Sequence, residues 1–264
     1  HGERYDSFES YGLSNLNILK GGTKDHSFYC MENLPSPFLD VVKSSPMNVN
    51  FVSFLEERTP PKDVLKRDEL LRSLGLNISS FKLPGVHNLQ NLLFASHIAF
   101  KMGATKEGLQ KAIDHFLGVD YRLQYVPSSL NLSCFNDAKS TNWDATFTAL
   151  RALHDKNDAS LYLILGGAKR GRGDSVPHEL LDFKEAIRTI FLIGETTASM
   201  AEELEGLGLP FKECYTLESV KNIVSSFEED QLGHLLFSPA FPSFDQYENY
   251  KVRGKHFREL FGKF

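Results

Sequence analysis

Charged and hydroxyl-bearing residues gather at three places where a short apolar run gives way to a polar segment. FNDAKSTNWDAT carries Asp137 and Lys139, GGAKRGRGD carries Lys169 and Arg170, and SPAFPSFDQ carries Ser243. Cations and hydroxyls bind carboxylates and phosphates through charge-assisted hydrogen bonds. The three segments therefore favour a site for an anionic substrate.

Each segment also has a simpler interpretation. Asp137, Thr141 and Asn142 are residue types that turns and helix N-caps prefer. GGAKRGRGD could be a solvated basic loop, whereas the two prolines of SPAFPSFDQ imply a fixed loop. Neither this glycine segment nor GGTKDHS fits the pattern GxxxxGK[ST], so no phosphate-binding loop of that type is expected in these residues.

A second candidate is the stretch PGVHNLQNLL, with Asn88 and Asn91 where a loop enters an apolar helix. Such amides usually cap the helix. They can equally recognise the edge of a base, because an amide offers a donor beside an acceptor.

From about residue 120 the hydrophobic pattern alternates between short apolar runs and amphipathic ones. Strands are expected in RLQYV and LNLSCFND around a Pro-Ser-Ser turn, then in SLYLILGG, TIFLIGE, KECYTL and HLLFSPA. Helices are expected in NWDATFTALRALHD, LLDFKEAIR, TASMAEELEGLG, ESVKNIVSSFEED and DQYENYKVRGKHFRELF. This alternation predicts a Rossmann-like, doubly wound α/β domain with a mostly parallel sheet and its first strand antiparallel at an edge. All three polar segments would then follow strands at the carboxyl edge, where such sheets bind ligands.

The first part of the chain is less periodic. A helix is expected over 5–22, closed by Gly21 or Gly22, and a strand in NVNFVSFLEE. NLQNLLFASHIAFKMG is apolar on nearly all sides and predicts a buried helix, followed by a helix with Thr105 as its N-cap. We expect a domain boundary near Gly118, giving domains 1–118 and 119–264.

Net charge, cysteine spacing and hydrophobicity indicate which kinds of protein this sequence does not resemble. The net charge is -5 over 264 residues, which gives no support for nucleic-acid binding. The three cysteines form no CxxC pair, which indicates a reducing compartment, and no apolar run approaches the ~18 residues of a membrane span. A cytoplasmic protein is expected. The sequence opens on HGERYDSFESY without an initiator methionine, so a piece of a longer protein is expected.

Taken in order, several of these stretches resemble the Mur ligases, and most closely their D-glutamate-adding members. The matching stretches are HGERYDSFESY, GVHNLQN, YRLQYV, FNDAKSTNWDAT, LILGGAKRG and LLFSPAFPSFDQYENYKVRGKHF. The resemblance implies part of the central ATP-binding domain (1–118) and the whole amino-acid-binding C-terminal domain (119–264). The implied activity is ATP-dependent addition of D-glutamate to UDP-N-acetylmuramoyl-L-alanine through an acyl phosphate, with ATP and Mg²⁺ required and a monomer expected. Without a phosphate-binding loop, these residues alone are expected to be inactive.

The resemblance also implies site residues. His1 is similar to a catalytic, metal-binding histidine, and Lys139 to a catalytic lysine. Cofactor binding is implied for Asn88, Asn91, Arg122, Asp137 and Lys139. Substrate binding is implied for Thr141, Arg170, Ser243, Phe244 and Tyr250.

The chain departs from the family pattern at three points. Asn15 stands at about the position of a lysine that is carbamylated in the family and bridges to a second magnesium. Tyr121 stands where a histidine usually precedes the arginine. The glycine loop reads Lys169-Arg170, so either cation could meet the substrate carboxylate. A non-catalytic nucleotide- or amino-acid-binding module on the same fold is the alternative, and a ligase of the same family adding another amino acid is a third hypothesis.

Overall fold

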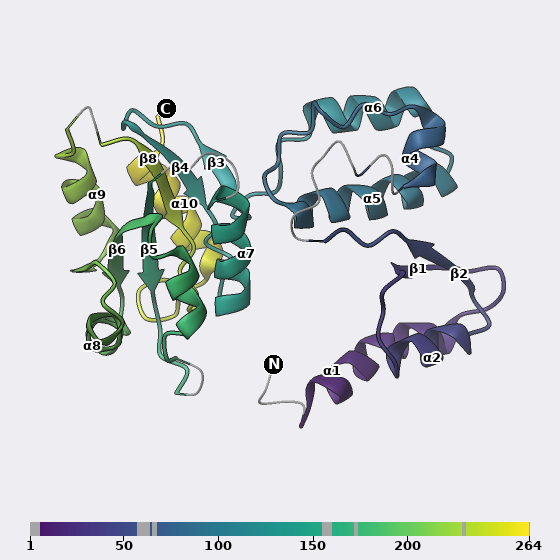
Figure 1. Cartoon of the computed structure of the whole chain (residues 1–264), viewed down its shortest axis with the longest axis horizontal. Coiled ribbons are helices and arrows are strands. Elements are labelled where there is room, and N and C mark those ends of the chain that lie inside the picture. The colour runs from purple at the N-terminus through teal and green to yellow at the C-terminus, as the bar shows by residue number, and fades with distance from the viewer. Residues whose placement is uncertain are drawn as a thin grey trace. The chain divides into compact units, whose positions relative to one another are not determined.

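The part of the chain that the structure describes forms two sheets, one in each of two structural units (Figure 1). The computed structural model describes residues 6–56, 64, 68–154, 160–171, 174–228 and 231–263. The first unit comprises the described residues up to Lys82 together with Val86–Phe116, and the second comprises Leu83–Gly85 with the described residues from Leu117 onward.

The second unit is built on a six-stranded sheet with the order β3-β4-β8-β5-β6-β7. Its strands are β3 (Gln124–Val126), β4 (Leu132–Asn136), β5 (Leu161–Gly166), β6 (Ile187–Ile193), β7 (Phe211–Tyr215) and β8 (Gly233–Phe237). Its helices are α7 (Trp143–His154), the 3-10 helix η2 (His178–Phe183), α8 (Thr197–Leu207), α9 (Leu217–Ser225) and α10 (Tyr250–Phe261). Only the edge strand β3 pairs antiparallel, with β4. This confirms the expected α/β architecture.

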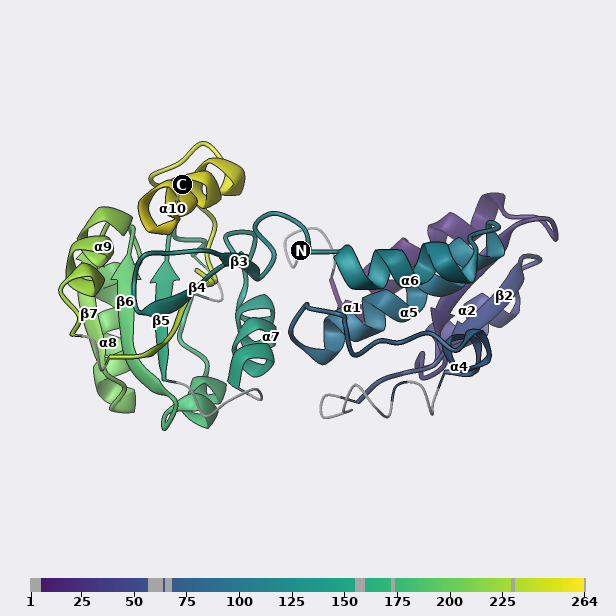
Figure 2. The ribbon, with the colours of Figure 1, turned by 90° about the horizontal axis from the view of Figure 1, so that it is seen from above.

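Helices cover both faces of this sheet (Figure 2). One core cluster joins α7, η2 and α8 to residues of β5 and β6, and the other joins α9 and α10 to the opposite side of the same strands. Every residue of β5 is buried, as a strand covered on both faces requires. The doubly wound arrangement follows from these two cores.

The parallel register brings the carboxyl ends of β4, β8 and β5 to one edge of the sheet. Asn136 lies beside Phe237, and Phe237 lies beside Ile164. At this edge Gly167 has φ +155, and a Cβ there would lie 2.2 Å from the carbonyl oxygen of Pro242. A glycine is therefore needed for the loop after β5 to pass so close to the loop after β8.

The first unit pairs a two-stranded parallel sheet with a group of helices. Its elements are α1 (Phe8–Asn15), the 3-10 helix η1 (Leu16–Gly21), β1 (Ser27–Met31), α2 (Phe38–Lys43), β2 (Asn48–Val52), α4 (Glu69–Leu74), α5 (Val86–Lys101) and α6 (Lys106–His115). The amide of Gln90 joins α5 to the end of β2, because its Nε2 donates to the carbonyl of Ser53 and its Oε1 accepts from the N–H of Leu55. Thr105 caps α6 as expected, with its side chain accepting from the N–H of Gly108.

Several expectations for individual elements are wrong. The helix expected over 5–22 is α-helical only to Asn15 and then tightens into η1, and the strand β1 was not predicted. LLDFKEAIR forms no α-helix, since its first residues belong to η2. The last helix begins at Tyr250, where Asn249 caps it, and not at Asp245.

The helix α5 is also less buried than its composition predicts. Only Leu89, Leu93 and Ser96 are buried along it, whereas Ile98 and Phe100 are exposed. None of the helices in the described residues is long and apolar enough to span a membrane.

Candidate functional site

Three loops meet at the carboxyl edge of the second sheet and carry most of the predicted site residues. They are residues 137–142 after β4, the described residues 167–171 and 174–177 after β5, and residues 238–249 after β8. A fourth segment, after β6, joins them, because the backbone N–H of Glu195 donates to Asp245 Oδ2 over 3.0 Å. The side chain of Glu195 in turn accepts from the backbone N–H of Lys169 over 3.1 Å.

Asp137 is held tightly inside this edge. Its Oδ1 accepts from the backbone N–H of Leu123 over 3.0 Å, and its Oδ2 accepts from the hydroxyl of Ser238 over 2.8 Å. Burial raises the pKa of Asp137 to about 6, against the opposing effect of these two hydrogen bonds and of the charge on Arg122. The carboxyl group thus links the approach to β3 with the loop after β8. The simpler interpretation of Asn142 is confirmed beside it, because its Oδ1 accepts from the N–H of Ala145 in the first turn of α7.

Lys139 is exposed and lies over an aromatic ring. Its Nζ is 5.4 Å from the centroid of Tyr250, and the ring of Tyr121 meets that of Tyr250 edge to face at 6.3 Å. The backbone N–H of Lys139 donates to the carbonyl of Tyr121. The fold therefore brings Lys139 together with Tyr250, two residues 111 positions apart in the sequence. Arg122, which follows Tyr121, is exposed.

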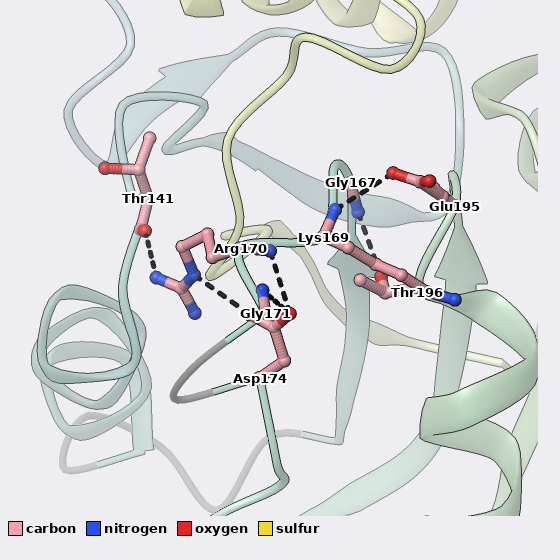
Figure 3. Close-up of polar contacts among 8 residues, drawn as sticks. All are labelled: Thr141, Gly167, Lys169, Arg170, Gly171, Asp174, Glu195 and Thr196. Atoms are coloured by element: carbon pink, nitrogen blue, oxygen red, sulfur yellow. Dashed lines mark hydrogen bonds and ion pairs between the residues drawn. The ribbon is translucent and has the colours of Figure 1, made fainter.

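Thr141 and Arg170 also lie together (Figure 3). Arg170 Nη1 donates to the carbonyl oxygen of Thr141 over 2.9 Å, and its Nε donates to Asp174 Oδ1 over 3.1 Å. The guanidinium carbon lies 4.9 Å from the centroid of Phe241, which is fully buried. Sequence reasoning included Arg170 among the site residues but missed Asp174 and Phe241.

Ser243 and Phe244 occupy the loop after β8 in different environments. Ser243 is only 2% exposed, and its carbonyl accepts the N–H groups of Gln246 and Tyr247, so it closes a turn. Phe244 is 74% exposed. Ser243 does not stand at the entrance of α10, because that helix begins only at Tyr250.

Sequence reasoning also missed Arg253, a buried arginine on α10 that is 1% exposed. Its Nη2 donates to the carbonyls of Ala138 and Phe241, and its Nη1 donates to that of Pro242. Burial lowers the pKa of Arg253 to about 10. This one side chain joins the loop after β4 to the loop after β8. The only signal in the sequence was its place inside the stretch YENYKVRGKHF.

The remaining predicted residues lie in the first unit. Asn88 and Asn91 are in the first two turns of α5, with Asn88 partly buried and Asn91 exposed. Asn15 is the last residue of α1. The candidate metal ligand His1 lies outside the described residues.

The described residues do not fit a magnesium site built by the protein alone. No group of three or more His, Cys, Asp or Glu side chains in the described ranges could hold a metal ion. Asn15 adds no charge at the position where the family resemblance implies a lysine. ATP fits better, since Arg122 and Lys139 are exposed cations that could contact phosphates.

Comparison with known proteins indicates the family to which the chain belongs. No protein-family model matches the sequence. The UDP-N-acetylmuramoylalanine--D-glutamate ligase of Hydrogenobaculum sp. is 32% identical over 265 aligned residues, which cover 100% of this chain and 60% of that protein. The ligase of the same name from Elusimicrobium minutum is 34% identical over 195 residues, or 74% of this chain and 42% of that protein.

A solved structure shows the same fold. MurF from Acinetobacter baumannii matches 97% of this chain and 56% of its own with a TM-score of 0.63, at 15% identity. The α/β fold is thus that of the Mur ligase class of proteins, and the similarity over the whole chain shows that the chain belongs to the Mur ligase family. Within that family both sequence relatives above are D-glutamate ligases by name, and the chain spans about 42–60% of their length.

Proposed function

We propose that this chain is part of an ATP-dependent ligase that adds D-glutamate to UDP-N-acetylmuramoyl-L-alanine in peptidoglycan synthesis. The observation that carries the proposal is the similarity to a D-glutamate ligase over the whole chain, at 32% identity. The site at the carboxyl edge of the second sheet supports it, because Lys139, Arg170 and Thr141 form a cationic, donor-rich edge suited to an acidic substrate.

The second unit would receive the amino acid. Arg170 would bind a carboxylate of D-glutamate through its guanidinium, and Thr141, whose carbonyl already contacts Arg170, would lie against the same substrate. Phe244 and Tyr250 would supply apolar walls, and Ser243 would shape the loop between them. These contacts would hold the amine of D-glutamate in line with the activated carboxyl group.

The nucleotide-binding residues implied by the family resemblance are part of the same proposal. Asn88 and Asn91 would contact the adenine of ATP, whereas Arg122 and Lys139 would lie against its phosphates and Asp137 near its ribose. ATP supplies the phosphoryl group that activates the substrate carboxyl as an acyl phosphate, and the amine then displaces phosphate. Lys139 would stabilise the charge on the leaving phosphate. Because the described residues do not fit a metal, no step here is assigned to Mg²⁺, although His1 stays its proposed ligand.

The test is a ligase assay on the full-length protein that carries this chain. ATP, magnesium and UDP-N-acetylmuramoyl-L-alanine are supplied with and without D-glutamate, and the phosphate released and the mass of the product are measured. Release that depends on D-glutamate, with product heavier by one glutamyl residue, supports the proposal. A protein that binds the substrates without releasing phosphate is the binding module of the alternative hypothesis. Release with another amino acid in place of D-glutamate would instead indicate a different ligase of the family.

The same proposal covers the setting of the reaction. We propose that the substrates are small molecules and that the enzyme is a monomer that acts in the cytoplasm. The residues 1–264 alone are expected to show no turnover, because they contain no GxxxxGK[ST] loop to hold the ATP phosphates.

A further inference from the structure

The adjacent cations Lys169 and Arg170 point in opposite directions (Figure 3). The side chain of Lys169 extends toward Thr196 and is exposed, while that of Arg170 turns toward Thr141. The backbone explains the divergence, because the N–H of Lys169 is bound by Glu195 and that of Arg170 by Asp174. Of the two cations, Arg170 is therefore the one at the loop after β4.

Asp174 fixes both the backbone and the side chain of Arg170. Its Oδ2 accepts from the backbone N–H groups of Arg170 over 2.8 Å and Gly171 over 2.9 Å, and its Oδ1 accepts from Arg170 Nε. Burial alone would raise the pKa of Asp174, but these hydrogen bonds and the charge on Arg170 outweigh it, so the pKa of the carboxyl lies below its usual range. Asp174 is thus an anion over the whole physiological pH range.

The guanidinium is restrained on three sides. Asp174 holds its Nε edge, the carbonyl of Thr141 holds Nη1, and the ring of Phe241 lies at 4.9 Å from its central carbon. Asp174 and the carbonyl of Thr141 together fix the orientation of the guanidinium beside the loop after β4. The ring of Phe241 is fully buried, so packing fixes its position beside the guanidinium.

Stability does not account for this arrangement. The side chains of Arg170 and Asp174 are 26% and 24% exposed, and ion pairs in contact with water contribute little to folding. A cation fixed in advance, in contrast, avoids the cost of ordering a long side chain when an anion binds.

We propose that Asp174 is a positioning residue that presents the Arg170 guanidinium to a carboxylate of the incoming acidic amino acid, with Phe241 as its support. This inference rests on the proposed function, since the ligand is D-glutamate in that reaction. It assigns the carboxylate contact to Arg170 and excludes Lys169 from it.

The kinetic test uses Asp174→Asn in the full-length protein. An asparagine oxygen can still accept from the backbone N–H groups of Arg170 and Gly171, but its NH₂ then faces Arg170 Nε and cannot accept from it. The KM for D-glutamate should rise about tenfold, which corresponds to about 1.4 kcal/mol, with kcat and the KM for ATP nearly unchanged. An unchanged KM for D-glutamate would overturn the inference, and so would a uniform loss of all parameters together with thermal stability.

A double-mutant cycle shows whether Asp174 acts through Arg170. In the Arg170→Ala background, adding Asp174→Asn should raise the KM for D-glutamate no further, whereas independent action would add the two effects. Asp174→Glu should restore part of the KM by returning the negative charge. The matched control is Glu259→Gln, which breaks the exposed i,i+4 ion pair with Lys255 on α10 and should leave the KM within about twofold.

A second readout needs no activity and separates this inference from the proposed function. In a ¹H–¹⁵N NMR spectrum of residues 1–264, the Nε–H signal of Arg170, assigned by its loss in Arg170→Lys, should exchange slowly with water. In Asp174→Asn it should shift and broaden. If the full-length protein releases no phosphate, the proposed function fails while this measurement still decides the positioning role. A signal identical in both proteins would refute it.

Discussion

At the scale of single residues, Asp137 is a carboxyl group whose protonation is coupled to folding. Burial raises its pKa to about 6, whereas an unfolded aspartate titrates near ~3.9. The folded state therefore holds the proton more tightly, and the stability this contributes is full at low pH and is lost as pH rises from about 4 to about 6. Above that window the folded protein carries a partly buried anion at a cost of about 3 kcal/mol at most.

Asp137→Asn removes this titration and keeps the acceptor for the N–H of Leu123. The variant should melt close to the wild type at pH 4 and gain relative stability as the pH rises to 7. Thermal melts of both proteins across this range measure the difference. A difference in melting temperature that does not vary with pH would contradict the raised pKa.

Lys139 is a second single residue with a testable role, and it should affect ligase turnover more than stability. It is exposed, and its visible contact is the ring of Tyr250 at 5.4 Å, worth about 1 kcal/mol or less. If it stabilises charge on phosphate, Lys139→Ala should lower ligase turnover in the full-length protein by about 100-fold and stability by under ~1 kcal/mol. The control is Lys251→Ala, because Lys251 is likewise exposed but lies on α10. Parallel losses of thermal midpoint and turnover would argue that Lys139 is structural.

At the scale of elements, α10 holds the loops of the site in place through Arg253. At this buried position the Arg253 guanidinium donates hydrogen bonds to the carbonyls of Ala138, Phe241 and Pro242. Arg253→Met would leave these acceptors without that donor, and a buried unpaired polar group costs about 1–3 kcal/mol.

We therefore expect Arg253→Met to lower the free energy of unfolding by about 3 kcal/mol, measured by urea denaturation. Arg253→Lys should recover only part, because a single ammonium cannot span three carbonyls. Lys255→Met, exposed on the same helix, should change little. Wild-type stability in Arg253→Met would show that the loops hold their positions without the arginine.

At the scale of the whole molecule, the two units differ in how their sheets are supported. The second unit has six strands with large buried cores on both faces, while in the described part of the first unit the two strands β1 and β2 pair with each other and contact smaller core clusters. A sheet of two strands is marginally stable by itself, so the first unit depends more on its helices than the second unit does.

In native-state hydrogen exchange, the strand amides of the two units should therefore exchange at different rates. The amides of β5 and β6 should exchange only on global unfolding of the second unit, and those of β1 and β2 should exchange at least about 100-fold faster. Equal protection of both sets would show that the first unit is as well supported as the second.

Much of the second unit could be predicted because its signals are local. The apolar run Leu161–Gly166 predicts a buried strand, and the hydrophobic spacing of Trp143–His154 predicts a helix. The missed strand Ser27–Met31 is mostly half-buried, and its apolar run, Phe28–Met31, is too short for periodicity to distinguish a strand from a helix. The segment His178–Phe183 is tightened into a 3-10 helix against the core, which its composition does not reveal.

The sequence by itself determined the order of the strands and of most helices in the second unit, the family, and the polar segments at the carboxyl edge, because periodicity and motif spacing are properties of neighbouring residues. Tertiary structure alone decided that Arg170 and not Lys169 turns toward Thr141, that Asp137 is buried enough for its pKa to reach about 6, and that Arg253 lies inside. Those outcomes depend on contacts between distant positions, such as the hydrogen bond from Asn136 Nδ2 to the carbonyl of Gly254, 118 residues away. Burial and hydrogen bonding of this kind arise only when the folded chain brings such positions together.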